Sequence, residues 1–427
     1  MQTPVHDVVG IGFGPSNLAL AIALEEEHGT GADAVFFEKQ PAFGWHRGML
    51  IDGATMQVHF LKDLVTLRNP SSPYSFLSYL HAKDRLVDFV NHKTMFPTRL
   101  EFHDYLEWTA AAFAGRVRYG AEVVALRPRD ADTLEVVVRR DDELETHLAR
   151  NVVIAAGLEP VLPKGVRPGE RIWHTEDLLT RLEERRGWTP ERIVVVGAGQ
   201  SAAEAVEHLH RTLPGTEVCA VFARYGYSPA DDSAFANRIF DPQAVDHYHT
   251  APDEVKRLLF AYSRNTNYSV VDLDLIDELY RRSYAEKVAG TERLRILNAS
   301  RVLDVRTEPG AVRLRVRFLP TGETTALAAD AVVYATGYRE RDPFDLLGEA
   351  GQHCRTGPGG RAVVERDYRI ATAPGCEWGV YLQGATEHSH GIASSLLSMT
   401  AVRTGEIVRS MARSTAARRT ARVTQEA

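Results

Sequence analysis

The sequence predicts an α/β protein with two Rossmann-like dinucleotide-binding domains, the second inserted in the first, plus a smaller helical region. Two glycine-rich turns carry this prediction: residues 10–14 follow the apolar pair 8–9, and residues 197–199 follow the apolar run 193–196. Each turn reads as a strand passing into a helix whose N-terminus can hold a pyrophosphate. Two such sites in one chain suggest electron transfer between a nicotinamide and a flavin.

The first turn is followed by a helix-like apolar stripe and then by an apolar strand that ends at Glu38. Glycines permit the tight turn and a close approach of the backbone to a pyrophosphate, and a carboxylate at Glu38 would accept hydrogen bonds from a ribose. A solvated charge at a strand end is the alternative for this acid. The residues expected to bind the first dinucleotide are Gly10, Gly12, Gly14, Pro15 and Glu38.

The second turn lies in the same strand–turn–helix context. No acid follows the next strand, residues 218–222, but Arg224 does. An acid there would select the free 2′-hydroxyl of NAD, whereas an arginine suits the 2′-phosphate of NADP. A plain surface arginine is the alternative. The residues expected to bind the second dinucleotide are Gly197, Gly199, Gln200, Ser201 and Arg224.

Apolar strands that end in small-residue turns, at residues 152–157 and 331–338, divide the chain further. We expect the segment after the second of these strands to complete the first domain. The predicted boundaries are 1–165 and 330–410 for a FAD-binding domain, 185–225 and 295–329 for an NADPH-binding domain, 226–294 for a substrate-binding region, and 411–427 for an arginine-rich, disordered tail.

Composition and charge exclude several classes of function. A net charge of −7 argues against a nucleic-acid-binding surface. No apolar run approaches the roughly 18 residues of a membrane span, and the first strand begins too early to leave room for a signal peptide, so we expect a cytoplasmic protein. The three scattered cysteines form no CxxC pair, and His388 with His390 lacks a third ligand, so no metal is expected.

Eight segments follow one another in a characteristic order: 10–18 (GIGFGPSNL), 56–63 (MQVHFLKD), 102–106 (FHDYL), 196–204 (VGAGQSAAE), 231–240 (DDSAFANRIF), 265–271 (NTNYSVV), 335–338 (ATGY) and 387–398 (EHSHGIASSLLS). In this joint order the chain resembles the flavin-dependent N-hydroxylating monooxygenases, most closely the L-ornithine N5-monooxygenases of siderophore and related peptide biosynthesis. The resemblance covers nearly the whole chain to about residue 410. Pro15 in place of a third glycine is the family's own variant, and proline is acceptable in a first helical turn.

The resemblance implies roles for particular residues. Gln57 matches the glutamine beside the flavin ring, and Lys62 matches the lysine that pairs with the substrate's carboxylate. Asn237 and Asn267 match the asparagines that hold the α-amino and carboxyl groups, with Asn267 also near the nicotinamide ribose. The implied catalytic residues are Gln57 and Asn267. Without the resemblance, a surface lysine and a turn residue would be the alternatives for Lys62 and Asn267.

Further residues complete the implied site. Ser398 and the backbone of Leu396 match positions that close the far end of the substrate pocket. Trp45 and His46 belong to a segment that packs near the flavin, and Leu396 contributes to the flavin side as well. Arg224 aligns only approximately with the family's phosphate-binding arginine.

The implied reaction is hydroxylation of the side-chain amine of L-ornithine by O2 and NADPH, through a C4a-hydroperoxyflavin, to N5-hydroxyornithine. The attacking amine must be neutral, and a desolvated pocket would lower its pKa from roughly 10.4. The resemblance also implies a homotetramer. An L-lysine N6-monooxygenase is the second reading. A general flavin monooxygenase fits less well, because Glu170 stands where its FxGxxxH element needs glycine before His174. A non-enzymatic flavin redox sensor is the third alternative.

Overall fold

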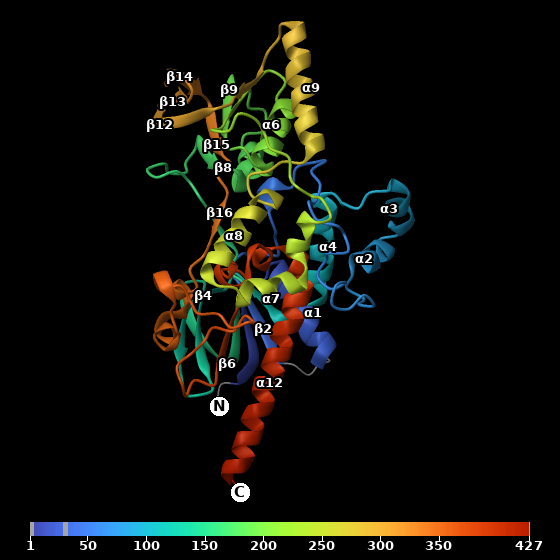
Figure 1. Ribbon diagram of the computed structural model, residues 1–427, viewed down its shortest axis with the longest axis vertical. Coiled ribbons are helices and arrows are strands. Elements are labelled where there is room, and N and C mark those ends of the chain that lie inside the picture. The colour runs from blue at the N-terminus through green and yellow to red at the C-terminus, as the bar shows by residue number, and fades with distance from the viewer. Residues whose placement is uncertain (1–3, 29–32, 427) are drawn as a thin grey trace.

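The computed structural model describes residues 4–28 and 33–426, and only the backbone of residue 28 and of residues 417–426. Its strands form two mainly parallel sheets that lie one above the other (Figure 1), and the chain passes from the first sheet to the second and back. This arrangement confirms the prediction of two Rossmann-like units with the second inserted in the first.

The first sheet has the strand order β3-β2-β1-β6-β5-β4, and β17 pairs with β6. Strands β1, β2, β3, β6 and β17 run parallel, whereas β4, β5 and the first half of β6 form an antiparallel extension. The strands are β1 (Val5–Ile11), β2 (Ala34–Glu38), β3 (Val117–Tyr119), β4 (Glu122–Pro128), β5 (Leu134–Arg140), β6 (Glu143–Ile154) and β17 (Gly379–Leu382).

Two helices far apart in the chain cover one face of this sheet. Helix α1 (Pro15–His28) is buried over its first ten residues, and α12 (Thr400–Glu426) lies along it through Ile407, Val408 and Met411 (Figure 1). The helices α2 (Phe76–Ala82), α3 (Leu86–His92) and α4 (Arg99–Ala112) continue this layer with a cluster of aromatic rings, most of them in edge-to-face contact. Burial of these faces is the main stabilising term of the first domain.

The second sheet has the order β11-β10-β9-β15-β8, all parallel. Its strands are β8 (Ile172–His174), β9 (Arg192–Val196), β10 (Glu217–Val221), β11 (Leu294–Leu297) and β15 (Ala331–Tyr334). Helices α5 (Leu178–Glu183), α6 (Gln200–Thr212) and α9 (Leu273–Ala289) pack on one face. A meander of β12 (Ser300–Glu308), β13 (Ala311–Phe318) and β14 (Thr324–Ala329) packs on the other face.

The placement of residues 331–334 in the first domain was wrong. Strand β15 lies in the second sheet between β9 and β8, with Val332 and Val333 fully buried. The physical reason is the preceding residue: both Glu191 and Arg192 donate backbone N–H groups to Asp330 Oδ2, at 2.8 and 3.0 Å, so β15 starts level with β9. The strand that returns the chain to the first sheet is β17.

The crossing between the two domains is a short antiparallel pair. Strand β7 (Leu158–Pro160) leaves the first domain and pairs with β16 (Tyr338–Glu340), which brings the chain back. After β16 come α10 (Phe344–Leu347), β17 and α11 (Glu387–His390), which complete the first domain.

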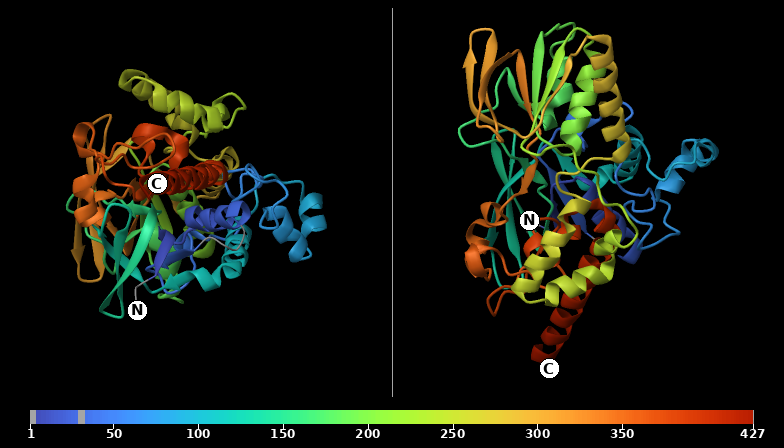
Figure 2. Two further views of the ribbon diagram at one scale, coloured as in Figure 1. Left: turned by 90° about the horizontal axis from the view of Figure 1, so that it is seen from below. Right: turned by 45° about the horizontal axis from the view of Figure 1, so that its top comes forward.

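The predicted substrate region 226–294 divides between the two domains. Helix α7 (Pro242–Thr250) packs on the first domain, where Val245 contacts Ala393 and Met399. Helix α8 (Asp253–Ser263) follows it at the surface (Figure 2). Helix α9 instead packs on α6, because its apolar face meets the second core and Glu286 accepts a hydrogen bond from His210 at 2.7 Å.

Residues 411–426 are helical, which corrects the prediction of a disordered tail. They continue α12, whose start is held by the buried Ile407 and Val408. Alanine and arginine, which the segment contains in number, are strong helix formers, so the helix can extend beyond its packed part. Ala427 lies outside the described residues.

A buried ion pair ties the two domains together. Arg99 in α4 binds Glu204 in α6 through two contacts, NH1 to Oε2 at 2.9 Å and NH2 to Oε1 at 2.8 Å, and both side chains are largely shielded from solvent. Arg99 NH1 also donates to the carbonyl oxygen of Met49 at 2.8 Å.

We predict that Glu204→Ala destabilises the protein by about 3–5 kcal/mol, because it leaves the Arg99 charge buried without its partner. Urea unfolding followed by circular dichroism measures the change. The matched control is Glu184→Ala, which removes an exposed carboxylate that pairs with Arg181 and Arg185 and should cost less than about 1 kcal/mol. Equal losses in the two variants would contradict this role of the pair.

Candidate active site

The first glycine turn joins β1 to α1 and leaves room for a ligand. Gly12 has a φ of +81°, and a Cβ there would lie 2.4 Å from the carbonyl oxygen of Ala155, so the turn requires glycine. A Cβ at Gly10 would meet the Phe36 ring at 2.2 Å. At Gly14, by contrast, no protein atom lies within 4 Å of the added Cβ. Helix α1 begins at Pro15, so its N-terminus points into this open space.

Glu38 lies at the end of β2, as predicted, and is only 8% exposed. Its Oε2 accepts the backbone N–H of Phe13 at 2.7 Å, and its Oε1 accepts that of Gln40 at 2.8 Å. The carboxylate therefore holds the glycine turn against the strand. Because an ionised carboxylate has about four acceptor sites, it retains capacity for a ribose hydroxyl. The ribose role stays a prediction.

The second glycine turn joins β9 to α6. Gly197 has a φ of +152°, and a Cβ there would lie 2.4 Å from the carbonyl oxygen of Ala335. Gly199 is the N-cap of α6, and Ser201 follows half-buried in its first turn. A Cβ at Gly199 would lie 3.4 Å from Cα of Ser269. The segment 265–271, which carries the predicted site residue Asn267, is therefore in contact with this turn.

Arg224 reaches the same turn. It follows β10, is exposed, and its NH1 donates to the carbonyl oxygen of Ser269 at 2.7 Å. Because Ser269 contacts Gly199, the guanidinium lies beside the N-terminus of α6. This position suits an arginine that would bind a phosphate on the nucleotide's ribose.

Gln57 contacts a residue that directly precedes α9 of the second domain. Its Nε2 donates to Asp272 Oδ1 at 3.2 Å, and Gln200 Nε2 donates to Asp272 Oδ2 at 2.9 Å. Two of the predicted cofactor-binding residues are thus joined through a carboxylate that sequence reasoning missed.

Lys62 lies half-buried beside the short helix 236–240, which contains Asn237. Its Nζ is 5.5 Å from the centre of the Phe240 ring. Burial lowers the pKa of Lys62, and the negative charge of Asp241 opposes that shift. Among the described residues, no carboxylate forms an ion pair with Lys62 within 4.0 Å. The cation is therefore available to an anionic substrate group.

The loop that carries Lys62 is held by its neighbour Asp63. The buried Asp63 carboxylate accepts the backbone N–H groups of Val65, Thr66 and Phe76 at 3.0, 2.7 and 2.7 Å, together with the Thr66 hydroxyl. Asn237 itself donates through Nδ2 to the carbonyl oxygen of Asp232 at 2.6 Å. The structure thus places Lys62 and the Asn237 helix side by side, with Asn237 turned toward its own loop.

Asn267 is exposed at the end of a short helical turn, and its neighbour Tyr268 makes the tertiary contact. The Tyr268 hydroxyl donates to Glu387 Oε1 in α11. Burial and this contact raise the pKa of Tyr268, and burial also raises the pKa of Glu387. The only indication of this pair in the sequence is position: Tyr268 directly follows Asn267, and Glu387 begins the segment 387–398.

The resemblance assigns Ser398 to the closed end of the substrate pocket, and that role stays a prediction. Ser398 is 3% exposed, and its Oγ has no hydrogen-bond partner among the described residues. Thr386 Oγ1 is likewise buried and unpartnered in the part of the chain that the structure describes. Leu396 is half-buried, and its carbonyl oxygen accepts the hydroxyl of Thr400 at 3.2 Å. Each of these two hydroxyls therefore retains a free hydrogen-bonding group among the described residues, as do those of Tyr227, Tyr334 and Ser394.

Trp45 and His46 lie at the crossing between the domains. The Trp45 ring is 4.6 Å from the His46 ring and 6.1 Å from Phe102, and the His46 ring is 6.2 Å from Tyr338 in β16. His46 has a left-handed backbone, with φ of +48°. The proximity of these two residues to a flavin stays a prediction.

His388 and His390 contact backbone carbonyl groups. The Nε2 atoms lie 3.0 Å from the carbonyl oxygen of Ala362 and 3.2 Å from that of Arg366, respectively. Within residues 4–28 and 33–426, no three histidine, cysteine or acidic side chains are grouped as metal ligands would be. Over the same residues, no helix has the length and apolar character needed to cross a membrane.

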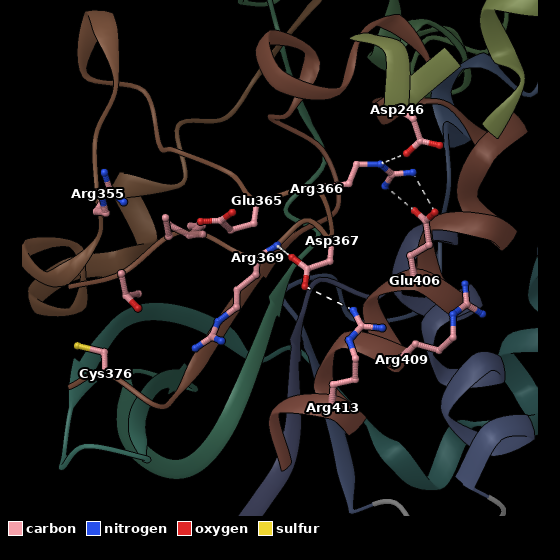
Figure 3. Close-up of a pocket in the computed structure, with 13 residues that line it drawn as sticks. Asp246, Arg355, Glu365, Arg366, Asp367, Arg369, Cys376, Glu406, Arg409 and Arg413 are labelled. Atoms are coloured by element: carbon pink, nitrogen blue, oxygen red, sulfur yellow. Dashed lines mark hydrogen bonds and ion pairs between the residues drawn. The ribbon is translucent and has the colours of Figure 1, made fainter. Parts of the chain in front are cut away.

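A large polar cavity of about 810 Å³ lies elsewhere, between α7, the segment 355–376 and α12 (Figure 3). Two of its five arginines form ion pairs with its acids: Arg366 contacts Asp246 and Glu406, and Arg413 lies 3.8 Å from Asp367. None of the predicted site residues lines it. The cavity is therefore separate from the candidate active site.

The family model for L-lysine 6-monooxygenase/L-ornithine 5-monooxygenase matches residues 4–340. The chain belongs to this family. It is 41% identical over 400 residues to an L-ornithine N(5)-monooxygenase from Burkholderia cepacia, with 91% of this chain and 90% of the relative covered. The family membership predicted from the eight segments is confirmed.

Solved structures agree with this family. The ornithine N-hydroxylase of Kutzneria sp. 744, solved with FADred, NADP+ and L-orn, is 48% identical with a TM-score of 0.93, over 96% of this chain and 99% of that one. The L-lysine 6-monooxygenase of Pseudomonas syringae is 32% identical with a TM-score of 0.84, over 96% and 99%.

We predict that Gly14→Val abolishes FAD binding without unfolding the protein, because the added side chain enters space that contains no protein atom within 4 Å. Absorbance at 450 nm per mole of purified protein measures bound flavin. Gly199→Val is the counterpart at the other turn and should retain the flavin while raising the KM for NADPH. If both variants lose flavin equally, the assignment of two separate nucleotide sites is wrong.

We also predict that Arg224→Ala weakens NADPH binding by about 1.5–3 kcal/mol, the scale of a hydrogen bond to a charged group, and leaves NADH binding nearly unchanged. Isothermal titration with each nucleotide measures both affinities. Arg317→Ala, which removes an exposed arginine from β13 of the same domain, controls for the loss of one positive charge. An equal loss for NADPH and NADH would contradict the phosphate role.

Proposed function

We propose that this protein is an L-ornithine N5-monooxygenase that hydroxylates the side-chain amine with O2 and NADPH and uses bound FAD. The observation that carries the proposal is Lys62, a half-buried cation on the first domain without an acid of the described chain within ion-pair distance. Such a group favours a substrate that brings its own carboxylate. The FAD, NADP+ and ornithine reported for the Kutzneria relative support the same reading.

The cofactors have suitable places in the chain. The turn from Gly10 to Pro15, with Glu38, would hold FAD, and the turn from Gly197 to Ser201, with Arg224, would hold NADPH. When bound, FAD reduced by NADPH supplies the activation of O2. The balanced reaction converts R–NH2, O2, NADPH and H+ into R–NHOH, NADP+ and H2O, so one oxygen atom forms the new N–O bond and the other leaves as water.

The chain's own residues bind and desolvate the substrate. Lys62 would pair with the α-carboxylate, and Asn237 and Asn267 would bind the α-amino and carboxyl groups. The unpartnered Ser398 hydroxyl would meet the far end of the molecule. The side-chain amine has to react in its neutral form, and removal from water favours that form. We assign the loss of its proton to solvent or cofactor, because no dedicated base is identified.

This chain is more similar to an ornithine hydroxylase than to a lysine monooxygenase, which favours ornithine as the substrate. The Kutzneria ornithine N-hydroxylase exceeds the Pseudomonas syringae L-lysine 6-monooxygenase in both identity, 48% against 32%, and TM-score, 0.93 against 0.84. An L-lysine N6-monooxygenase is the second candidate. Mass spectrometry of the products from ornithine, lysine and diamines with FAD and NADPH tests the two.

The proposal also includes the pathway, the compartment and the oligomeric state of the protein. N5-hydroxyornithine would serve siderophore or related peptide biosynthesis in the cytoplasm, and the protein would act as a homotetramer. Sedimentation of the purified holoenzyme measures its mass. A non-enzymatic redox sensor would oxidise NADPH at a rate independent of added amine, whereas the proposed enzyme oxidises it faster with ornithine.

We predict that Lys62→Ala raises the KM for ornithine roughly 30-fold or more, because loss of one partner of a desolvated pair typically costs about 2–5 kcal/mol. Flavin reduction by NADPH should be nearly normal. Since burial lowers the pKa of Lys62, the ammonium loses its proton below the usual pH range. The wild-type KM for ornithine should therefore rise as the pH increases through that lowered pKa, and this rise should vanish in Lys62→Ala.

Lys83→Ala is the matched control, because it removes an exposed lysine paired with Asp104 at 3.0 Å. Wild-type protein should turn over ornithine well, lysine poorly and putrescine barely, since putrescine has no carboxylate. A putrescine rate equal to that of ornithine, or an unchanged KM in Lys62→Ala, would refute the carboxylate pairing.

A further inference from the structure

Asp272 lies between the two predicted cofactor sites, and the proposed function assigns it no role. It directly precedes α9 and follows the segment 265–271. Its carboxylate is shared between two glutamines: Oδ1 accepts from Gln57 Nε2 at 3.2 Å, and Oδ2 accepts from Gln200 Nε2 at 2.9 Å. The backbone N–H of Asp272 donates to Gln200 Oε1 at 2.9 Å, so Gln200 is held at both ends of its amide.

The two glutamines come from different domains. Gln57 belongs to the segment between β2 and α2 of the first domain, and Gln200 is the first residue of α6, directly after the second glycine turn. The contacts continue from Gln200 Nε2 to Glu204 Oε1 at 3.0 Å, and from Glu204 to Arg99 of the first domain. Asp272 is thus a further polar connection between the domains, and it includes Gln57.

A carboxylate imposes a direction on both amides. An ionised aspartate can only accept hydrogen bonds, so each glutamine must present its NH2 group to Asp272. The Oε1 atom of Gln57 is then turned away from Asp272 and is free to accept a hydrogen bond from another group. A neutral amide or a small side chain at position 272 would remove this constraint, since it could meet either end of the glutamine or neither.

We propose that Asp272 is a positioning residue that orients the Gln57 amide and links it to the nucleotide-binding turn at Gln200. The proposal rests on the proposed function, in which Gln57 lies beside the flavin. Through Asp272, a nucleotide on the second turn favours the Gln57 orientation that the oxygen chemistry needs. When the link is absent, more of the activated oxygen is released as hydrogen peroxide and less reaches the amine.

The experiment uses FAD-loaded, full-length wild-type protein and four variants of it. The variants are Asp272→Ala, Asp272→Asn, Gln57→Ala, and the double variant of Gln57→Ala with Asp272→Ala. Asp274→Asn is the matched control, because it removes an exposed negative charge from the first turn of the same helix. Two readouts are measured for each protein: hydrogen peroxide released per NADPH oxidised with ornithine present, and the Kd for NADP+ by isothermal titration. Flavin content and Tm are recorded to establish that each variant is folded.

Asp272→Ala should raise the hydrogen peroxide yield and raise the Kd for NADP+ by about tenfold, the scale of one hydrogen bond to a charged group. Asp272→Asn should recover part of both losses, since its single acceptor oxygen can still hold one glutamine. The double variant should release no more hydrogen peroxide than Gln57→Ala alone, because both changes act through the same amide. Asp274→Asn should match wild type.

Several results would overturn the proposal. They are a wild-type peroxide yield in Asp272→Ala, additive effects in the double variant, and a loss in Asp274→Asn equal to that in Asp272→Asn. Failure of the proposed function gives a different result, in which wild-type protein yields no hydroxylated product from ornithine or lysine. In that case the NADP+ affinities still decide whether Asp272 supports the nucleotide turn, and an unchanged Kd in Asp272→Ala rejects it.

Discussion

The architecture depends on one steric constraint that occurs twice. At Gly12 and at Gly197 the backbone passes so close to a neighbouring strand that a Cβ would lie 2.4 Å from a carbonyl oxygen, of Ala155 in one case and Ala335 in the other. Both residues also have positive φ angles. Each sheet can therefore bring a strand end, a helix N-terminus and an open space together only with glycine at that position. The rest of the molecule is arranged around these two turns.

The prediction of two dinucleotide units succeeded because its signal is local. The glycines, the apolar strands before them and the helices after them all lie within one short stretch of chain. The assignment of β15 failed because a buried apolar strand carries no information about which sheet accepts it. Here the decisive contacts come from Asp330, whose carboxylate meets backbone groups about 140 residues earlier in the chain. Long-range contacts also explain why the region 226–294 divides between the domains. Helix α9 packs on α6 in a core whose other residues lie far away in the chain.

Candidate site residues could be proposed where motifs lie together in the chain and not where side chains meet across it. Gln57, Lys62, Asn237 and Asn267 came from resemblance within short segments. Asp272 and the Tyr268–Glu387 pair were missed, since their contacts span 215 and 119 residues, respectively. Nothing in the residue types marks them: an aspartate before a helix is an ordinary N-cap residue. The tail prediction failed for a related reason, because low apolar content does not exclude a helix that is already started by a packed segment.

The polar groups of the site divide into two kinds, and the division carries the functional argument. Glu38, Asp63 and Asp272 are satisfied by backbone N–H groups or side-chain amides, so they shape the site before any ligand arrives. Among the described residues, Lys62 has no ion-pair partner, and the Ser398 hydroxyl has no hydrogen-bond partner. Retaining such groups costs stability in the empty protein, and binding a ligand with a carboxylate and a polar far end removes that cost. In the proposed function, the preformed acids therefore provide the geometry of the site, whereas Lys62 and the Ser398 hydroxyl would provide affinity, and selectivity for an amino acid over a diamine would follow from the cation.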